Sequence, residues 1–106
     1  GIDLKALLDE VDRTAAELKR WRGRSQLAAY RRAVQSFVRA AVQRMYRVNQ
    51  DTRFDRRGVR ISSVTVQLID ERLEALTAAV VHGDDSAIPL AARLDEIRGL
   101  LLDLYG

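Results

Sequence analysis

The C-terminal stretch of residues 90–105 is the part of the sequence that most constrains the fold. It reads L-A-A-R-L-D-E-I-R-G-L-L-L-D-L-Y, and its apolar side chains recur at alternating spacings of four and three residues: Leu90, Leu94, Ile97, Leu101 and Leu104. This spacing places them in one stripe along a helix. Because such a helix is stable in water only when other helices cover its apolar face, the stretch predicts a bundle built around a helix of residues 87–105.

Three earlier stretches carry similar apolar stripes and predict helices at residues 4–22, 26–48 and 62–82. Asp3 is placed to cap the first helix, Gly23 to end it in the left-handed conformation, and Trp21 to cover one end of the core. Stripes joined by short connections are typical of an up-and-down bundle. We therefore predict an all-α, up-and-down four-helix bundle in a single domain of residues 1–106; the alternative is a three-helix core with a loosely attached first helix.

Residues 49–60 interrupt the helical pattern. They read N-Q-D-T-R-F-D-R-R-G-V-R and mix turn-forming residues with arginines, so we expect an arginine-rich loop there. The following run, I-S-S-V-T-V at residues 61–66, alternates apolar and polar side chains as a strand does, and its β-branched residues weaken helix propensity. A single short strand would have no strand to pair with, so we expect a helix with an irregular start.

Three motifs resemble a known family. L-D-E-I-R-G-L-L-L-D-L-Y, residues 94–105, resembles the closing signature of the YaaR-like family of small bacterial proteins. R-F-D-R-R-G, residues 53–58, resembles that family's turn between its middle helices, and Y-R-V at residues 46–48 lies where the family also has a tyrosine. The resemblance extends from about Ala6 onward, departs at residues 61–66, and implies a cytoplasmic helical bundle without an established activity.

The composition is that of a globular protein, with 47% hydrophobic and 31% charged residues. No apolar run approaches the roughly 20 residues that a membrane span requires, and no signal-peptide pattern opens the chain. Cysteine is absent, which argues against disulfides and thiol chemistry. We therefore expect a cytoplasmic protein that does not associate with membranes.

The net charge of +3 is unevenly distributed along the chain. Residues 13–60 contain 14 Lys and Arg against 3 Asp and Glu, a net charge of +11, whereas residues 61–106 contain 3 against 8, a net charge of −5. Residues 1–12 carry a net charge of −3. Such asymmetry indicates either an anionic partner or mutual attraction between the two halves of one bundle.

The sequence offers few residues for catalysis. It has one histidine, His82, and no cysteine, which argues against zinc. Asp70, Glu71 and Glu74 could suggest a di-iron site, but the Glu-x-x-His motif of such bundles is missing, and a helical wheel places all three opposite the apolar stripe. No nucleophile–base pair can be identified. We predict a protein that is not an enzyme, with no cofactor, no metal and no small-molecule substrate.

A band of arginines is the first of two candidate binding surfaces. It comprises Arg31, Arg32, Arg39, Arg44 and Arg47 on the second helix, with Tyr46 among them, and Arg53, Arg56, Arg57 and Arg60 in the loop. Arginine pairs in a fork with phosphate, and arginines near an aromatic ring are suited to a nucleic-acid backbone. Nucleic acid is therefore one candidate partner; the alternative is a solvated face that carboxylates of the other helices neutralise.

Gly99 marks the second candidate surface. It costs the most apolar helix about 1 kcal/mol relative to alanine, and a helical wheel places it away from the core, near Ala92 and Leu102. Small residues seven apart beside an exposed leucine would let another helix approach closely, although a tolerated surface glycine is the alternative. We therefore expect a protein-interaction module that binds a protein partner or forms a homo-oligomer, with nucleic-acid binding as the second hypothesis.

Overall fold

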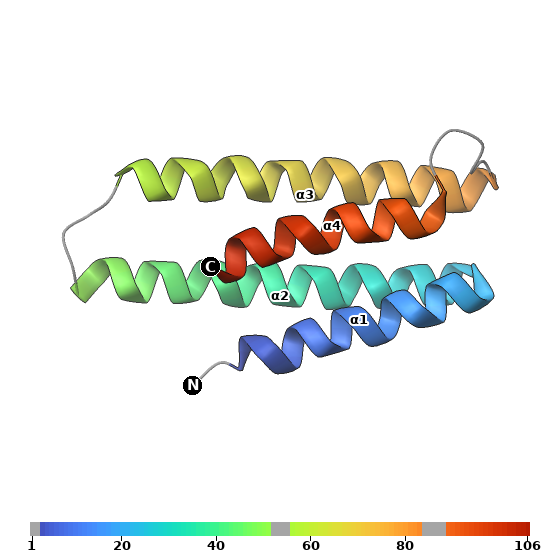
Figure 1. The fold of residues 1–106 in the computed structure, drawn as a ribbon, viewed down its shortest axis with the longest axis horizontal. Helices are drawn as coiled ribbons and strands as arrows, with labels where there is room; N and C mark the ends of the chain where they lie inside the picture. The colour runs from blue at the N-terminus through green and yellow to red at the C-terminus, as the bar shows by residue number, and fades with distance from the viewer. Residues whose placement is uncertain (1–2, 52–55, 84–88) are drawn as a thin grey trace.

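The computed structural model describes residues 3–51, 56–83 and 89–106, and the side chains of these residues except 48–51 and 56–61. It contains four helices: α1 (Leu4–Trp21), α2 (Arg24–Asp51), α3 (Arg56–His82) and α4 (Leu90–Tyr105). No strand occurs in the described residues. The predicted all-α four-helix bundle is therefore confirmed (Figure 1).

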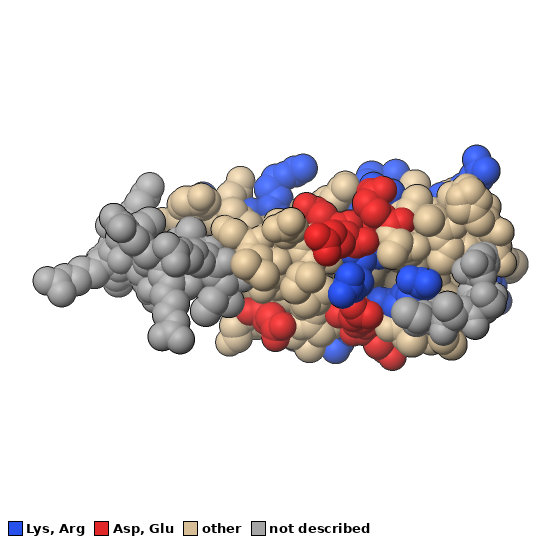
Figure 2. Space-filling view, turned by 90° about the horizontal axis from the view of Figure 1, so that it is seen from above, with Lys and Arg blue, Asp and Glu red and all other residues tan. Residues whose placement is uncertain are grey.

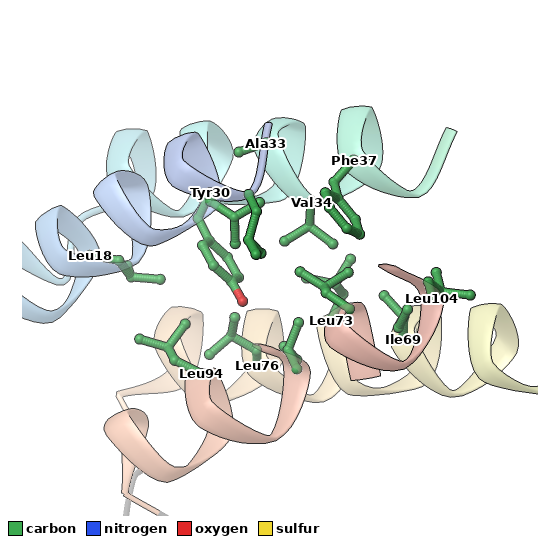
Figure 3. Close-up of a cluster of buried hydrophobic side chains, with 14 of the residues drawn as sticks. Leu18, Tyr30, Ala33, Val34, Phe37, Ile69, Leu73, Leu76, Leu94 and Leu104 are labelled. Carbon is green, nitrogen blue, oxygen red and sulfur yellow. The ribbon is translucent and has the colours of Figure 1, made fainter. Parts of the chain in front are cut away.

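The four helices pack as two layers with the apolar core between them. α1 packs along α2, and α3 packs along α4; α2 also contacts both α3 and α4, and α1 contacts α4. Figure 3 shows the side chains of the two layers meeting, with Tyr30 pointing from α2 toward Leu76 and Leu94. The alternative of a loosely attached first helix is wrong, because α1 contributes buried residues along most of its length.

The buried apolar residues follow the stripes expected from the sequence. All five residues of the α4 stripe are buried, and Leu101 and Ile97 are completely inaccessible. The rest of the apolar core consists of Leu4, Leu8, Val11, Leu18, Leu27, Tyr30, Ala33, Val34, Phe37, Ala40, Ala41, Ile69, Leu73 and Leu76. The core therefore depends on every helix, and α4 is buried along its whole apolar stripe.

The ends of α1 agree with the sequence only in part. Asp3 caps the helix as expected, with its carboxylate accepting from the Ala6 amide at 3.0 Å. The residue in the left-handed conformation at the end of α1 is Arg22, with φ 51°, and not Gly23 as predicted. Only Arg22 and Gly23 connect α1 to α2, so the chain has to turn directly after Trp21. Trp21 is 59% exposed rather than a cover for the core, since the buried stripe ends one turn earlier at Leu18.

The predicted loop of residues 49–60 is wrong in its extent. α2 continues to Asp51 and α3 begins at Arg56, and residues 52–55 lie outside the described part. Arginine has high helix propensity, which offsets the cost of Gly58 inside α3. The expected irregular start of the third helix is also wrong: residues 61–66 are helical, because Thr65 is buried and Val66 packs on the core, so packing outweighs β-branched propensity.

α4 begins at Leu90 and not at residue 87. Pro89 precedes it with ψ 149°, an extended conformation that a helix cannot include, and residues 84–88 lie outside the described part. At the other end, the ring of Tyr105 stacks on that of Phe37 with centroids 6.4 Å apart. This contact places the end of α4 near the middle of α2.

α2 and α3 consequently extend beyond the other two helices. They have 28 and 27 residues, whereas α1 and α4 have 18 and 16. The last buried residue of α2 is Ala41 and the first of α3 is Thr65 among the side chains described. We call residues 42–51 and 56–64 the arm; Figure 1 shows it projecting past α1 and α4.

Neighbouring leucines in α4 provide a test of this packing. Leu101 is fully buried and Leu102 is 42% exposed. We expect Leu101→Ala to lower the free energy of unfolding by about 2–5 kcal/mol, because it removes buried methyl groups and leaves a cavity. Leu102→Ala should change it by about 0.5 kcal/mol or less. Urea unfolding of dilute protein measures both, and equal losses would contradict the burial described.

Candidate functional site

The face formed by α2 and α3 combines a groove lined by apolar side chains with charged side chains at its edges. Because α1 and α4 contact each other, α2 and α3 form the opposite side, and neither α1 nor α4 lies over it. We call this side the α2–α3 face. It continues from the bundle into the arm, where the two helices have only each other to pack against among the described elements.

A groove of about 210 Å³ runs between the two helices on this face. Its lining consists of Val34, Gln35, Val38, Arg39, Val66, Ile69, Asp70 and Leu73. Val34 and Ile69 are fully buried and form its floor, Val38 and Val66 are half-buried, and Arg39 and Asp70 are exposed. The groove is smaller than the roughly 300–1,000 Å³ typical of small-molecule pockets, so it suits a few side chains of a docked protein better than a ligand.

The arm adds one exposed aromatic side chain to the same side. Tyr46 follows Arg39 by seven residues, which places it on the same side of α2, and it is 60% exposed. Val64 of α3 is 57% exposed, but its position on the helix turns it away from the groove. Between the helices, Met45 is half-buried and its sulfur accepts a hydrogen bond from the Ser62 hydroxyl at 2.9 Å. The inner seam of the arm is thus partly covered, and its outer aromatic side chain is not.

The structure divides the predicted arginine band. Arg32, Arg39, Arg44 and Arg47 are exposed on α2, together with Tyr46. Arg53 lies outside the described residues, and Arg56, Arg57 and Arg60 belong to α3 with side chains outside the description. The described part of the band therefore runs along α2 and onto the arm.

One arginine of the band binds within the chain. Arg31 donates to the Thr77 hydroxyl at 2.7 Å and to the Glu74 carboxylate at 3.1 Å, which joins α2 to α3. Two further arginines join other helices: Arg72 pairs with Glu96 between α3 and α4, and Arg98 pairs with Asp12 between α4 and α1 at 2.9 and 3.3 Å. Exposed pairs of this kind contribute about 0–1 kcal/mol each, so they support the helix alignment without dominating stability.

Carboxylates gather near the middle of the molecule in the view over α3 (Figure 2). Asp70, Glu71 and Glu74 are all exposed on that helix, in agreement with the solvent-facing orientation predicted for them. Within residues 3–47, 62–83 and 89–106, no three His, Asp or Glu side chains come together as a metal site would require. None of the described helices has a stretch long and apolar enough to cross a membrane.

The Gly99 surface on α4 is open and mostly charged. Gly99 and Ala92 are exposed, Leu102 is 42% exposed, and exposed Asp95 and Asp103 lie on the same helix. A methyl group added at Gly99 would meet no atom within 4 Å, so no contact within the chain requires glycine there. The described pocket beside this surface is lined by Arg72, Ala75, Arg93 and Glu96. Three of these four side chains are charged, which gives the surface less support as an interface than the α2–α3 face.

Tyr30 carries the most strongly perturbed ionisable group described. Its side chain is buried in the core, and its hydroxyl makes no hydrogen bond with the described residues. Burial raises the pKa of this hydroxyl well above its ordinary value, and the Asp12 carboxylate raises the pKa further. The apolar residues around it in Figure 3 give it no proton acceptor, so its position indicates a core residue rather than a catalytic one.

Sequence reasoning did not find the groove. The apolar stripes predicted at residues 26–48 and 62–82 include Val38 and Val66 as core residues, and the helical wheel placed Asp70 opposite the stripe, so no groove between them was expected. The available signal was the width of the apolar stripe in residues 26–48. With Val38 added to Val34, Phe37 and Ala41, that stripe is wider than a single buried helix face requires. Because the stripe alone does not say which of these residues the shorter helices cover, the groove required the packing to be known.

Three comparisons with known proteins agree with the sequence resemblance. Residues 2–105 match the model of a family described as a protein of unknown function (DUF327). The chain is 31% identical over 102 residues to the uncharacterized protein YaaR of Bacillus subtilis, covering 96% of this chain and 70% of that protein. It also matches a crystal structure of a DUF327 protein from Thermotoga maritima, with a TM-score of 0.83 and 30% identity over 96% of this chain and 83% of the other. The predicted YaaR-like resemblance is therefore confirmed.

Replacing Tyr30 by phenylalanine tests the account of its hydroxyl. We expect Tyr30→Phe to leave the free energy of unfolding unchanged or to raise it by up to about 1 kcal/mol, because no hydrogen bond is lost. The folded chain holds this proton to higher pH than the unfolded chain. The parent's stability should therefore decline as the pH rises above 10.0, and the variant should lack this part of the decline.

Urea unfolding at neutral pH and above pH 10.0 measures both effects. A variant that is less stable than the parent by more than about 1 kcal/mol at neutral pH would show that the hydroxyl has a partner in solution.

Proposed function

This chain belongs to the DUF327 family of proteins of unknown function, and from that starting point we propose that it is a non-catalytic module that binds another protein through the α2–α3 face. The observation that carries the proposal is the groove between α2 and α3, with exposed Tyr46 about two helical turns beyond Arg39 on the same side of α2. We further propose that the protein works in the cytoplasm, in keeping with its lack of cysteine.

The chemistry of the face matches that of protein interfaces. Their buried centres are apolar, and tyrosine and arginine are enriched among the residues that contribute most to binding. Val38 and Val66 would form such a centre, with Arg39 and Tyr46 beside it. The polar edge that Gln35 and Asp70 provide is what a rim in contact with water requires.

The non-catalytic part of the proposal rests on the geometry of the described residues. The strongly perturbed hydroxyl, that of Tyr30, lies inside the core, and the acidic residues of α3 face solvent. The described pockets are shallow, with volumes of about 180, 190 and 210 Å³. A catalytic site normally combines a larger cavity with converging polar groups.

Nucleic acid is the second candidate partner, and the exposed arginines of α2 favour it. Arg32, Arg39 and Arg44 make no ion pair with the described residues. Free guanidinium groups along one helix could bind successive phosphates. Asp70, Glu71 and Glu74 on the neighbouring helix oppose this function, because a polyanion that lies across the α2–α3 face would meet them.

Two exposed aromatic residues allow a matched test of the protein-binding proposal. A photoreactive phenylalanine analogue replaces Tyr46 in one variant and Trp21 in the other. The two side chains are 60% and 59% exposed; Trp21 is the last residue of α1, next to the start of α2, whereas Tyr46 is near the other end of α2. We expect irradiation in the native cell to produce nuclease-resistant protein adducts from position 46 and not from position 21. No protein adduct from position 46, or equal adducts from both, would contradict the proposal.

Salt titration tests the second candidate. If arginines of α2 bind phosphates, affinity for single- or double-stranded oligonucleotides should fall steeply with salt. Arg44→Gln and Arg47→Gln should each reduce the slope of log K against log salt by about 1, whereas Arg24→Gln, at the other end of α2, should not. Absence of binding at low salt would exclude this function for the isolated chain.

A further inference from the structure

We propose that the α2–α3 face binds a second copy of this chain, in a two-fold dimer in which Arg39 of each copy pairs with Asp70 of the other. The inference rests on the proposed function, because it assigns a partner to the same face. It follows from the charges at the two edges of the groove, from the symmetry that these charges allow, and from the alignment of α2 with α3.

The two edges of the groove carry opposite charges that are not used within the described chain. Arg39 lies on the α2 edge and Asp70 on the α3 edge; both line the groove and both are exposed. They do not pair with each other, and neither forms an ion pair with another described residue. The face thus consists of a basic edge, an apolar centre and an acidic edge, so it is complementary to a partner with the reverse order.

A second copy supplies the reverse order under one arrangement. If the two-fold axis runs across the helices, α2 lies on the second copy's α2, and Arg39 faces Arg39. If the axis runs along the helices, α2 of each copy lies on α3 of the other, and Arg39 faces Asp70 at two symmetric positions. Because like charges opposed across an interface disfavour association, the charges select the axis along the helices.

The register of the two helices allows these residues to meet. α2 and α3 are antiparallel, and their alignment is fixed by the Arg31–Glu74 contact at 3.1 Å and the Met45–Ser62 contact at 2.9 Å. These contacts place Arg39 within about one helical turn of the level of Asp70. An axis along the helices keeps each residue at its own level. The Arg39 side chain then has to span at most about one turn to reach Asp70 of the second copy.

The same arrangement covers the half-buried apolar side chains. Val38 on α2 and Val66 on α3 both line the groove. With α2 of one copy on α3 of the other, Val38 lies over Val66 of the second copy, and the reverse pair is equivalent by symmetry. The centre of the interface is then four valines between two symmetric ion pairs, which is the apolar core and polar rim of ordinary protein interfaces.

Charge reversal gives a specific test. Sedimentation equilibrium of the purified parent chain across a wide concentration range should show a dimer. Arg39→Asp and Asp70→Arg should each weaken self-association at least about tenfold, because each places like charges opposite one another at both symmetric positions. Arg24→Asp and Asp103→Arg change the net charge equally, away from the groove, and should associate as the parent does. Circular dichroism checks that every variant keeps its helical fold.

Mixing the two single variants is the decisive measurement. The Arg39→Asp chain is acidic at both positions and the Asp70→Arg chain is basic at both. A mixed dimer therefore has opposite charges at both symmetric positions, and we expect mixing to restore the parent's affinity. If the substitutions weakened association only by altering the fold of their own chain, mixing the two variants would not restore it.

Three results would overturn the proposal: a parent that stays monomeric, single variants that associate as the parent does, or a mixture that does not associate. Loss of association in Gly99→Ala together with unchanged charge variants would also overturn it, and would place the interface on α4. The proposed function fails separately, through the absence of protein adducts from position 46. Adducts with a different protein and a monomeric parent would reject the second copy and leave the α2–α3 face as a binding surface.

Discussion

Burial of the α4 stripe is the constraint on which the rest of the structure depends. Five apolar residues on a 16-residue helix must all leave water, and each fully buried leucine or isoleucine side chain contributes about 1.5–3 kcal/mol. No single neighbouring helix can cover a stripe of that width. α4 therefore contacts α1, α2 and α3 together, and these three contacts determine where the other helices lie.

The lengths of the helices then explain why α2 and α3 extend past α1 and α4 as the arm. The 16 residues of α4 and the 18 of α1 cover only part of helices that have 28 and 27 residues. Beyond Ala41 and before Thr65, α2 and α3 lack the cover that the shorter helices supply to the core. The arm is thus a consequence of unequal helix lengths, and Tyr46 lies on it beyond the groove.

The periodic spacing of apolar residues was sufficient to predict the helices and the side chains that they bury in the core. The stripe of Leu90, Leu94, Ile97, Leu101 and Leu104 could be identified from spacing alone, because burial in a bundle repeats with the helical turn. Residues 61–66 were predicted as helix but with an irregular start, because their local propensity favours a strand; the regular helix there has Thr65 buried and Val66 packed on the core. The position of Trp21 failed for a related reason: its spacing continues the stripe, but whether a neighbour covers it depends on where the helices end. The groove between Arg39 and Asp70 joins residues that are 31 positions apart in the sequence, so no local pattern indicates it.

The order of contacts along the chain has a consequence for how the bundle forms. The most extensive helix pairs, α1 with α2 and α3 with α4, are neighbours in sequence, and folds rich in such local contacts fold quickly because little chain entropy is lost before contacts form. Two helical hairpins can therefore assemble early and dock through the contacts of α2 with α3 and α4 and of α1 with α4. Arg98 and Asp12, which are 86 residues apart, can pair only when both hairpins have docked. Their bidentate ion pair is then a late event in folding, one that closes the bundle after its core has already formed.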